Sequence, residues 1–544
     1  MNRFSIALCF VVAASQAQAQ TYDLPFKADD LRDDERVYWG RDYHAKSGAQ
    51  AWGFDFEIVR YDPKKKKWLK YKSIEGKDDS DWTGRPNKDW YVHGKNVYAM
   101  RDGVVIACWR NAPENYLSGR GKGNYHDEMT KYEDGDGACD AEPSRIYGGG
   151  NGMWVQHADG SRAEYAHFMP GTVPAALCPN DDALLPKIPS QTVADAWTHL
   201  RLPARRTPIA VRRGQFLGKA GNVGCSSNPH THVHVETGGS TGATYASGSP
   251  VQMSFERGLY VKENTLGPFQ EWKSFAGKPI PEGPLYIWPP RSLGVEYARH
   301  GFDAANFGAF VQHLADSGYG PTWIDAYNVG GKNFLNHVWR PASGWRAFFL
   351  VNATTYQQEF DKASADGLEP IFVESSVSGG QARYTMIFVK NAPGDAYARH
   401  GLTYDQHMDE MAKATGMGMV PVNVSVISIG GERRYTVLHR TGKPGTRAVK
   451  SQIAEEAYQP EYDDQTAAGR KPVYLNAYVH GGKPFISAIF GPVSTPARKD
   501  SHGMSAASYQ TEYASALKAG MLTRAVTSFD GAQTQHRYAA CWWK

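Results

Sequence analysis

The first half of the chain alternates apolar and polar residues over short runs, as β-strands do. Residues 51–58 alternate in this way and place Asp55 on a predicted strand. Residues 152–157 and 163–168 flank an Ala-Asp-Gly-Ser turn, which predicts a β-hairpin that ends at His167. Long polar, Gly-rich segments separate these runs. We therefore expect a mainly β, antiparallel fold with long loops.

A further alternating run carries three histidines. His230, His232 and His234 alternate with Thr or Val, so they project from one face of a predicted strand. Three imidazoles on one face are a poor apolar core, whereas neutral imidazole is a common zinc ligand. The spacing favours a metal site, and a polar, solvated strand face is the alternative.

The second half of the chain is a repeat that follows a Pro-rich linker, predicted over residues 266–295. A Gly-Gly or Asp-Gly turn recurs with its second Gly at 331, 380, 431, 482 and 531. A β-run lies on each side of every turn, and a helical stretch precedes most of them. The spacing predicts an α+β domain over residues 296–544, with five helix–hairpin units that pack on their neighbours. A propeller fits the period too, but a helix in each unit argues against four-stranded blades.

Length and charge narrow the choice of partners. The 544 residues exceed one ordinary domain, and 60 Lys and Arg against 56 Asp and Glu give a formal charge of +4. So mild an excess does not indicate nucleic acid, and it suits an anionic polymer such as a cell wall. Beyond the N-terminus no run reaches the roughly 18 apolar residues that a membrane helix needs. We expect no membrane span.

Residues 1–19 have the features of a bacterial signal peptide. Arg3 is followed by an apolar stretch over residues 6–14 and by the small-x-small cleavage site Ala17-Gln18-Ala19. These features predict a mature start near Gln20 and a secreted or periplasmic protein.

The remaining cysteines would then lie in an oxidising compartment, where disulfides persist. They are Cys108, Cys139, Cys178, Cys225 and Cys541. Proximity in the sequence favours the pairs Cys108–Cys139 and Cys178–Cys225, with Cys541 free, among several possible pairings.

Several motifs occur in an order that resembles one enzyme family. Asp55 lies on an early strand, and Tyr-Ala-His ends a hairpin at His167. Gly-Gln-x-Leu-Gly-x-x-Gly-Asn-x-Gly follows over residues 214–224, and then Pro-His-x-His over residues 229–232. Together they resemble the LytM/lysostaphin-type zinc metallopeptidases, across roughly residues 40–240. The resemblance implies a LytM-like domain over residues 20–265.

The resemblance also implies a set of site residues. Members hold one zinc ion with a His, an Asp and the second His of His-x-His, which makes Asp55 and His232 metal ligands. His230 and His167 match the two histidines that position or deprotonate water and steady the developing oxyanion. An open zinc site and a nearby imidazole suit that chemistry, because zinc lowers the pKa of bound water to about 7.

The sequence departs from the family at the first ligand. The family's His-x-x-x-Asp spacing would put a histidine at position 51, which is Ala51. His44 is the nearest candidate for the missing ligand, and His234 is a substitute on the face of the histidine strand. Otherwise the site is degenerate and holds zinc weakly or not at all.

The repeats resemble the bacterial tandem repeat domain of polyglycine-hydrolase-like proteins. We find no titratable constellation that recurs among them, so we expect a rigid spacer or a surface for the wall or for a protein or glycan partner. The whole chain is predicted to be a secreted zinc metalloendopeptidase that cuts peptidoglycan cross-links or another Gly-rich peptide. The alternative, which Ala51 permits, is an inactive LytM-like protein that binds cell wall or activates another hydrolase.

Overall fold

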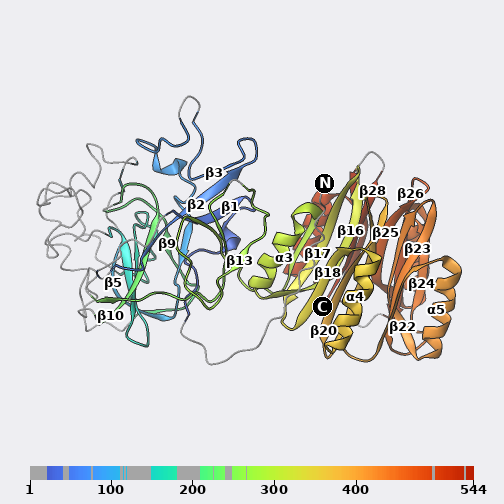
Figure 1. Cartoon of the computed structure of the whole chain (residues 1–544). Coiled ribbons are helices and arrows are strands. Elements are labelled where there is room, and N and C mark those ends of the chain that lie inside the picture. The colour runs from blue at the N-terminus through green and yellow to red at the C-terminus, as the bar shows by residue number, and fades with distance from the viewer. Residues whose placement is uncertain are drawn as a thin grey trace, which may run out of the picture. The chain divides into compact units, whose positions relative to one another are not determined.

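The computed structural model divides into two compact units, one ending at Ser292 and the other beginning at Leu293 (Figure 1). The predicted signal peptide, His44, Cys139 and Cys225 lie outside the described residues. In the part of the chain that the structure describes, no helix is both long and apolar enough to cross a membrane. The described residues are 21–40, 48, 50–74, 78–110, 114–115, 118, 149–179, 209–224, 226–238, 248–264, 266–492, 497–531 and 535–544.

A 12-stranded antiparallel sheet forms the first unit, as the alternating pattern predicts. Its order is β13-β12-β14-β1-β2-β10-β7-β6-β5-β8, with β11 beside β10 and β3 beside β2, while β4 pairs with β9. In the described residues it is accompanied by the short 3₁₀ helices η1 (Ala28–Asp30) and η2 (Asn87–Asp89). The strands are β1 (Glu35–Trp39), β2 (Phe54–Asp62), β3 (Lys67–Leu69), β4 (Asn96–Tyr98), β5 (Gly103–Trp109), β6 (Gly152–Gln156), β7 (Arg162–Ala166), β8 (Ile209–Val211), β9 (Phe216–Lys219), β10 (Thr231–Thr237), β11 (Ser249–Pro250), β12 (Leu259–Lys262), β13 (Lys273–Ser274) and β14 (Leu285–Trp288).

Strand alternation separates the apolar core of this unit from its polar face. On β2, Phe54 and Phe56 are buried in the core, with ring centroids 5.1 Å apart, and Asp55 between them points the other way. On β10, Val233 and Val235 join the same core. The histidines of β10 therefore share the face of the sheet that carries Asp55.

The predicted linker over residues 266–295 is wrong for much of its length. It contains β13 and β14, and β14 pairs with β1 through Val37 and Ile287. Leu285 and Ile287 are fully buried. Proline lacks a backbone N–H and so tends to flank strands, and here Pro residues stand directly before and after β14. The high proline content therefore marks the ends of short strands.

The predicted disulfide pairs are also wrong. Cys108 at the end of β5 bonds to Cys178, 70 residues later, with the two Cα atoms 5.7 Å apart. Arg110 holds the same segment by donating from Nε to the carbonyl oxygen of Cys178 at 2.9 Å. Proximity in the sequence fails here because strand pairing folds the chain back on itself. Cys541 is free and buried, as predicted.

The second unit contains the five predicted repeats, and each has one strand more than the sequence indicated. Every repeat runs strand, helix, strand, strand, and its first strand pairs with its last in a three-stranded antiparallel sheet. In chain order the repeats are β15 (Tyr297–Asp303), η4 (Ala304–Asn306), α3 (Phe307–Asp316), β16 (Tyr319–Val329) and β17 (Lys332–Pro341); β18 (Trp345–Val351), α4 (Ala353–Ala365), β19 (Leu368–Ser378) and β20 (Gln381–Lys390); β21 (Ala396–Leu402), α5 (Tyr404–Gly416), β22 (Met419–Ile429) and β23 (Glu432–Thr441); β24 (Ala448–Ala454), η5 (Glu455–Ala457), α6 (Tyr458–Ala467), β25 (Arg470–His480) and β26 (Lys483–Pro492); β27 (Arg498–Met504), α7 (Ala506–Lys518), β28 (Leu522–Gly531) and β29 (Gln535–Trp543).

The five repeats close into a ring through the second strand of each repeat in chain order, which is β16, β19, β22, β25 or β28. Between neighbours, Ser375 donates its backbone N–H to Ser425 at 3.0 Å, Val426 to Asn476 at 2.8 Å, and Ala477 to Thr527 at 2.7 Å. The last repeat meets the first, because Thr527 donates to Asp325 at 2.8 Å and Trp323 donates to the carbonyl oxygen of Val526 at 2.7 Å. Each sheet has three strands, in agreement with the prediction that the repeats are not four-stranded blades. The helix in each repeat nevertheless does not prevent the repeats from closing into a ring.

One histidine–tyrosine pair recurs at the joints, contrary to our expectation that no titratable constellation repeats. The ring centroids of His400 and Tyr356 lie 4.4 Å apart, and those of His502 and Tyr458 lie 4.9 Å apart. His300 and Tyr509 make the same contact between the first and last repeats, at 4.6 Å. Burial lowers the pKa of His300 to about 4, so this imidazole is neutral near pH 7. The pair packs one repeat against the next, and the closing joint has the same contact as the joints between the second and third and between the fourth and fifth repeats.

Candidate metal centre

Three neighbouring strands bring the predicted site residues together. β10 pairs with β2 so that His232 lies opposite Asp55, and it pairs with β7 so that His232 lies opposite Ala166. His167 follows β7 directly. Residues more than 170 positions apart in the sequence therefore meet in the middle of one sheet.

Asp55 and His232 form the centre of the site. Nδ1 of His232 lies 2.8 Å from Oδ1 of Asp55, and Nε2 of His230 lies 3.6 Å from the same oxygen. The Asp55 side chain is 42% exposed, whereas that of His232 is 5% exposed. The carboxylate is thus reached from solvent, and the imidazole is held in the sheet.

His167 and His230 present the same ring nitrogen to the site. Nδ1 of His167 lies 2.7 Å from the carbonyl oxygen of Val223, and Nδ1 of His230 lies 2.8 Å from that of Asn228. A carbonyl oxygen can only accept, so each Nδ1 donates a proton to its carbonyl and Nε2 is the nitrogen left for the site. The two ring centroids are 4.5 Å apart. The pair is therefore oriented by backbone carbonyls.

The backbone of His167 is held in an unusual conformation. Its φ of 68° lies in the left-handed region that side chains other than glycine rarely adopt. Its N–H donates to the carbonyl oxygen of Gly149 at 2.8 Å, and its own carbonyl accepts from Gly221 at 2.9 Å. Strain of this kind persists where the surroundings over-determine it, and such places are often functional sites.

Burial and neighbouring charges set the protonation of the imidazoles. Burial lowers the pKa of His167 well below its usual range, and His230 and His232 lower it further, so His167 is neutral near pH 7. Burial also lowers the pKa of His232, but the hydrogen bond and charge of Asp55 outweigh burial and raise it. The site therefore contains a neutral imidazole beside a carboxylate–imidazole pair.

The stretch before β2 provides no ligand at the position that the family uses. Ala51 is 4% exposed, and its side chain has no atom that can bind a metal. Gly53 packs against the histidines so closely that an added Cβ would lie 3.3 Å from Cβ of His234 and 3.4 Å from Cε1 of His232. His44 lies outside the described residues.

The donor set that is described suits zinc. Carboxylate oxygen and imidazole nitrogen are ordinary zinc ligands, and three protein ligands with one open position are typical of catalytic zinc sites. Asp55 and His232 supply two such donors at adjoining positions, open to solvent on the carboxylate side. The residues present therefore fit the metal that the sequence suggested.

Two further residues, His234 and Glu164, lie beside the site, and the sequence did not place them next to each other. His234 shares the histidine face, and Glu164 lies opposite it on β7. Glu164, His232 and His234 form a buried group whose ligand-type atoms lie within 4.8 Å of one another. Glu164 was missed because nothing in the sequence gives the β7–β10 register.

His157, directly after β6, is not part of the site. Its Nδ1 lies 2.8 Å from the carbonyl oxygen of Asp102, and burial lowers its pKa. It is a hydrogen-bonded structural histidine.

Comparison with known proteins identifies the repeats. They match the family described as "Polyglycine hydrolase-like, structural repeat" over residues 296–341, 342–391, 394–438, 451–492 and 496–544. These segments coincide with the five units of the ring. No curated protein matches the chain.

Several solved structures resemble the chain weakly, and all of those named here are peptidases of the lysostaphin or zinc type. A zinc-containing peptidase from Vibrio cholerae is 13% identical, with a TM-score of 0.13, over 37% of this chain and 48% of that one. The catalytic domain of lysostaphin from Staphylococcus simulans is 16% identical, with a TM-score of 0.10, over 30% and 84%. Lysostaphin itself is 11% identical, with a TM-score of 0.12, over 56% and 86%. The match spans about half the length of the Vibrio cholerae chain, and similarities this weak carry no conclusion about activity.

Proposed function

We propose that the first unit is a zinc metalloendopeptidase. The observation that carries the proposal is the convergence of four side chains from three paired strands and the segments that adjoin them. Asp55 and His232 lie 2.8 Å apart, and His230 and His167 stand beside them with Nε2 directed to the site. A polar, solvated strand face would not require two histidines oriented by backbone carbonyls or a strained backbone at His167.

Each residue has a role in this proposal. Asp55 and His232 would hold the zinc ion together with a third ligand, for which His44 is the candidate. When bound, zinc would activate water and polarise a peptide carbonyl group. His167, neutral near pH 7, offers the lone pair of Nε2 as a proton acceptor. His230, with Nε2 3.6 Å from Asp55, is placed to hold a proton or steady negative charge on the substrate.

The proposed substrate is a peptide bond in peptidoglycan cross-links or in another Gly-rich peptide. The mild positive charge of +4 suits an anionic wall polymer. The Cys108–Cys178 disulfide supports a secreted or periplasmic location, because such bonds persist in oxidising compartments. The ring of repeats would target or space the enzyme through a glycan or protein partner.

A second function stays open because of Ala51. The family's first ligand position is a buried alanine here, so the unit would be an inactive module if His44 does not complete the site. Such a module would bind cell wall or activate another hydrolase.

Metal content measured together with hydrolysis separates the two functions. Purified full-length protein is expected to hold about one zinc per chain, to clear a peptidoglycan suspension and to cleave a pentaglycine peptide. His232→Ala and Asp55→Ala should lose the metal and the activity together. His167→Ala should keep the metal and lose activity, because this residue is not a ligand in the proposal.

His157→Gln is the matched control, since it changes a buried histidine directly after β6 that does not reach the site. It should keep metal and activity. Zinc-free wild-type protein that still binds the wall would exclude the enzyme and favour the inactive module. Unchanged zinc content in His44→Ala would remove His44 from the ligand set.

A further inference from the structure

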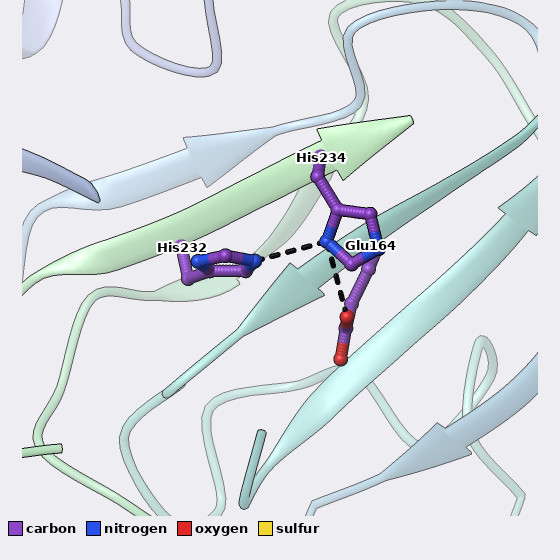
Figure 2. A group of neighbouring side chains, drawn as sticks. All are labelled: Glu164, His232 and His234. Atoms are coloured by element: carbon purple, nitrogen blue, oxygen red, sulfur yellow. Dashed lines mark hydrogen bonds and ion pairs between the residues drawn. The ribbon is translucent and has the colours of Figure 1, made fainter. Parts of the chain in front are cut away.

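A second histidine and a carboxylate lie behind the proposed zinc ligand. Nε2 of His232 is 2.9 Å from Nδ1 of His234, and that nitrogen is 3.3 Å from Oε2 of Glu164 (Figure 2). His234 is fully buried, and Glu164 and His232 are 3% and 4% exposed. The three groups therefore form a chain that leads inward from the ligand, on the side opposite Asp55.

The group has ligand-type atoms, but its geometry suits hydrogen bonding better than a second metal. The two imidazole nitrogens are 2.9 Å apart, which is an ordinary N–H···N hydrogen-bond distance. Full burial of His234 also leaves no open side for water or substrate.

We propose that His234 and Glu164 are positioning residues that orient His232 for the metal. This inference rests on the proposed zinc site. An imidazole can bind a metal through either nitrogen, and the hydrogen bond made by the other nitrogen decides which one. The contact with His234 occupies Nε2 of His232, which directs Nδ1 toward Asp55. When Nδ1 of His232 binds the metal, Nε2 of His232 carries the proton and donates it to Nδ1 of His234, while Glu164 lies 3.3 Å from that nitrogen and limits the position of the His234 ring.

The surroundings keep this chain in place. The Trp154 and His234 rings pack in a T-shaped arrangement, with centroids 5.4 Å apart and planes at 87°. Gly53 closes the other approach, because even a Cβ at this position would lie 3.3 Å from Cβ of His234. The β7–β10 register places Glu164 directly opposite His234. A ring packed in this way holds one orientation without the metal.

The experiment measures zinc affinity by competition with a chromophoric chelator, using the full chain. His234→Phe keeps a ring of similar size and removes both nitrogens, and we expect zinc to bind about 10–100-fold more weakly while still reaching one per chain. Glu164→Gln should show a smaller loss in the same direction. His234→Asn restores a polar atom near the place of Nδ1, and it should recover part of the affinity. His157→Phe, the same change at the buried histidine outside the site, should stay within about twofold of wild type.

The absorption spectrum of the Co²⁺-substituted protein gives a second readout, which a purely structural role would not move. It should change in His234→Phe and not in His157→Phe. Affinity within twofold of wild type in folded His234→Phe would overturn the positioning role. If His234→Phe does not fold, an unchanged affinity in Glu164→Gln would overturn it. Loss of stoichiometric zinc at saturation would overturn it too, by making His234 a direct ligand. Wild-type protein that binds no zinc would contradict the proposed function as well, so the two failures are distinguishable.

Discussion

Both units bury polar side chains, but they do so in different ways. In the first unit, His232, His234 and Glu164 come from two strands and occur once, and they lie beside a carboxylate that faces solvent. In the ring, Asp325 and Glu374 occupy equivalent positions on β16 and β19 and are 0% and 1% exposed. Such a carboxyl is compensated within the ring, because Asp325 accepts from Thr527, Asn336 and Ser528.

This difference separates a site from a structural device. A polar group that serves chemistry needs an open side, and Asp55 provides one with 42% exposure of its side chain. A polar group at the centre of a ring has partners from neighbouring repeats and no exposed surface, so it contributes to the specificity of packing. Burial of titratable groups alone therefore does not identify a catalytic site.

The largest expected effect tests whether the buried polar residues of the first unit serve catalysis. His230→Ala should lower the rate of pentaglycine cleavage about 100- to 10,000-fold, as the loss of an acid–base group does. Zinc content should stay at one per chain, because His230 is not a ligand in the proposed site. The check is a steady-state rate beside a metal assay. Full activity in zinc-loaded His230→Ala would remove this residue from the catalytic set.

The next effect tests whether contacts between repeats stabilise the ring. Trp323 packs on Phe372 and Tyr474 of other repeats and donates to the carbonyl oxygen of Val526. Trp323→Ala should destabilise the ring by about 3–5 kcal/mol through the cavity and the lost contacts. Urea unfolding followed by tryptophan fluorescence measures the change, with zinc content as the control. A simultaneous loss of zinc would show that the two units do not behave separately.

The disulfide tests how far covalent closure supports the first unit. A Cys108→Ser and Cys178→Ser double variant should lose about 2–4 kcal/mol, because the bond closes a loop of 70 residues in the unfolded chain. Thermal unfolding of wild type with and without reductant checks the same quantity. Cys541→Ser is the control, since this cysteine is free. Equal stability of the double variant and wild type would contradict a stabilising role.

The smallest effect concerns pH and the ring. Burial raises the pKa of Asp325 to about 7, and burial and Asp325 together raise that of Glu374 well above its usual range. Both groups hold protons in the folded ring that the unfolded chain releases at lower pH. The contribution of Asp325 is therefore full below about pH 4 and is lost as the pH rises through about 7, and the contribution of Glu374 also falls as the pH rises.

Glu374→Gln should remove the part of this dependence that comes from Glu374 and gain stability relative to wild type between pH 5 and pH 8, by roughly 1 to 3 kcal/mol. Unfolding midpoints at the two pH values measure it. Ser425→Ala, at the equivalent position of the next repeat, is the control without a titratable group. A parallel pH profile for Glu374→Gln and wild type would contradict the raised pKa of Glu374.

The sequence predicted elements and motifs better than it predicted their neighbours. The hairpin of β6 and β7, the five repeats and the antiparallel sheet follow from local alternation and a regular period. The pairing of Cys108 with Cys178, the place of β14 beside β1 and the closure of the ring do not, because each depends on segments that are distant in the chain. The extra first strand of each repeat is short and interrupted by a bulge, which hides its alternation.

The sequence by itself determined that His232 and His234 share one face of a strand, with His230 directly before it, and that Asp55 stands on an early strand, because side chains alternate along any strand. Tertiary structure alone decided that β10 lies between β2 and β7. That order brings Asp55 to one ring nitrogen of His232, at 2.8 Å, and His234 to the other, at 2.9 Å. It also places Glu164 opposite His234. Which strands pair, and in which register, depends on how the whole sheet buries its apolar face, and no local pattern contains that information.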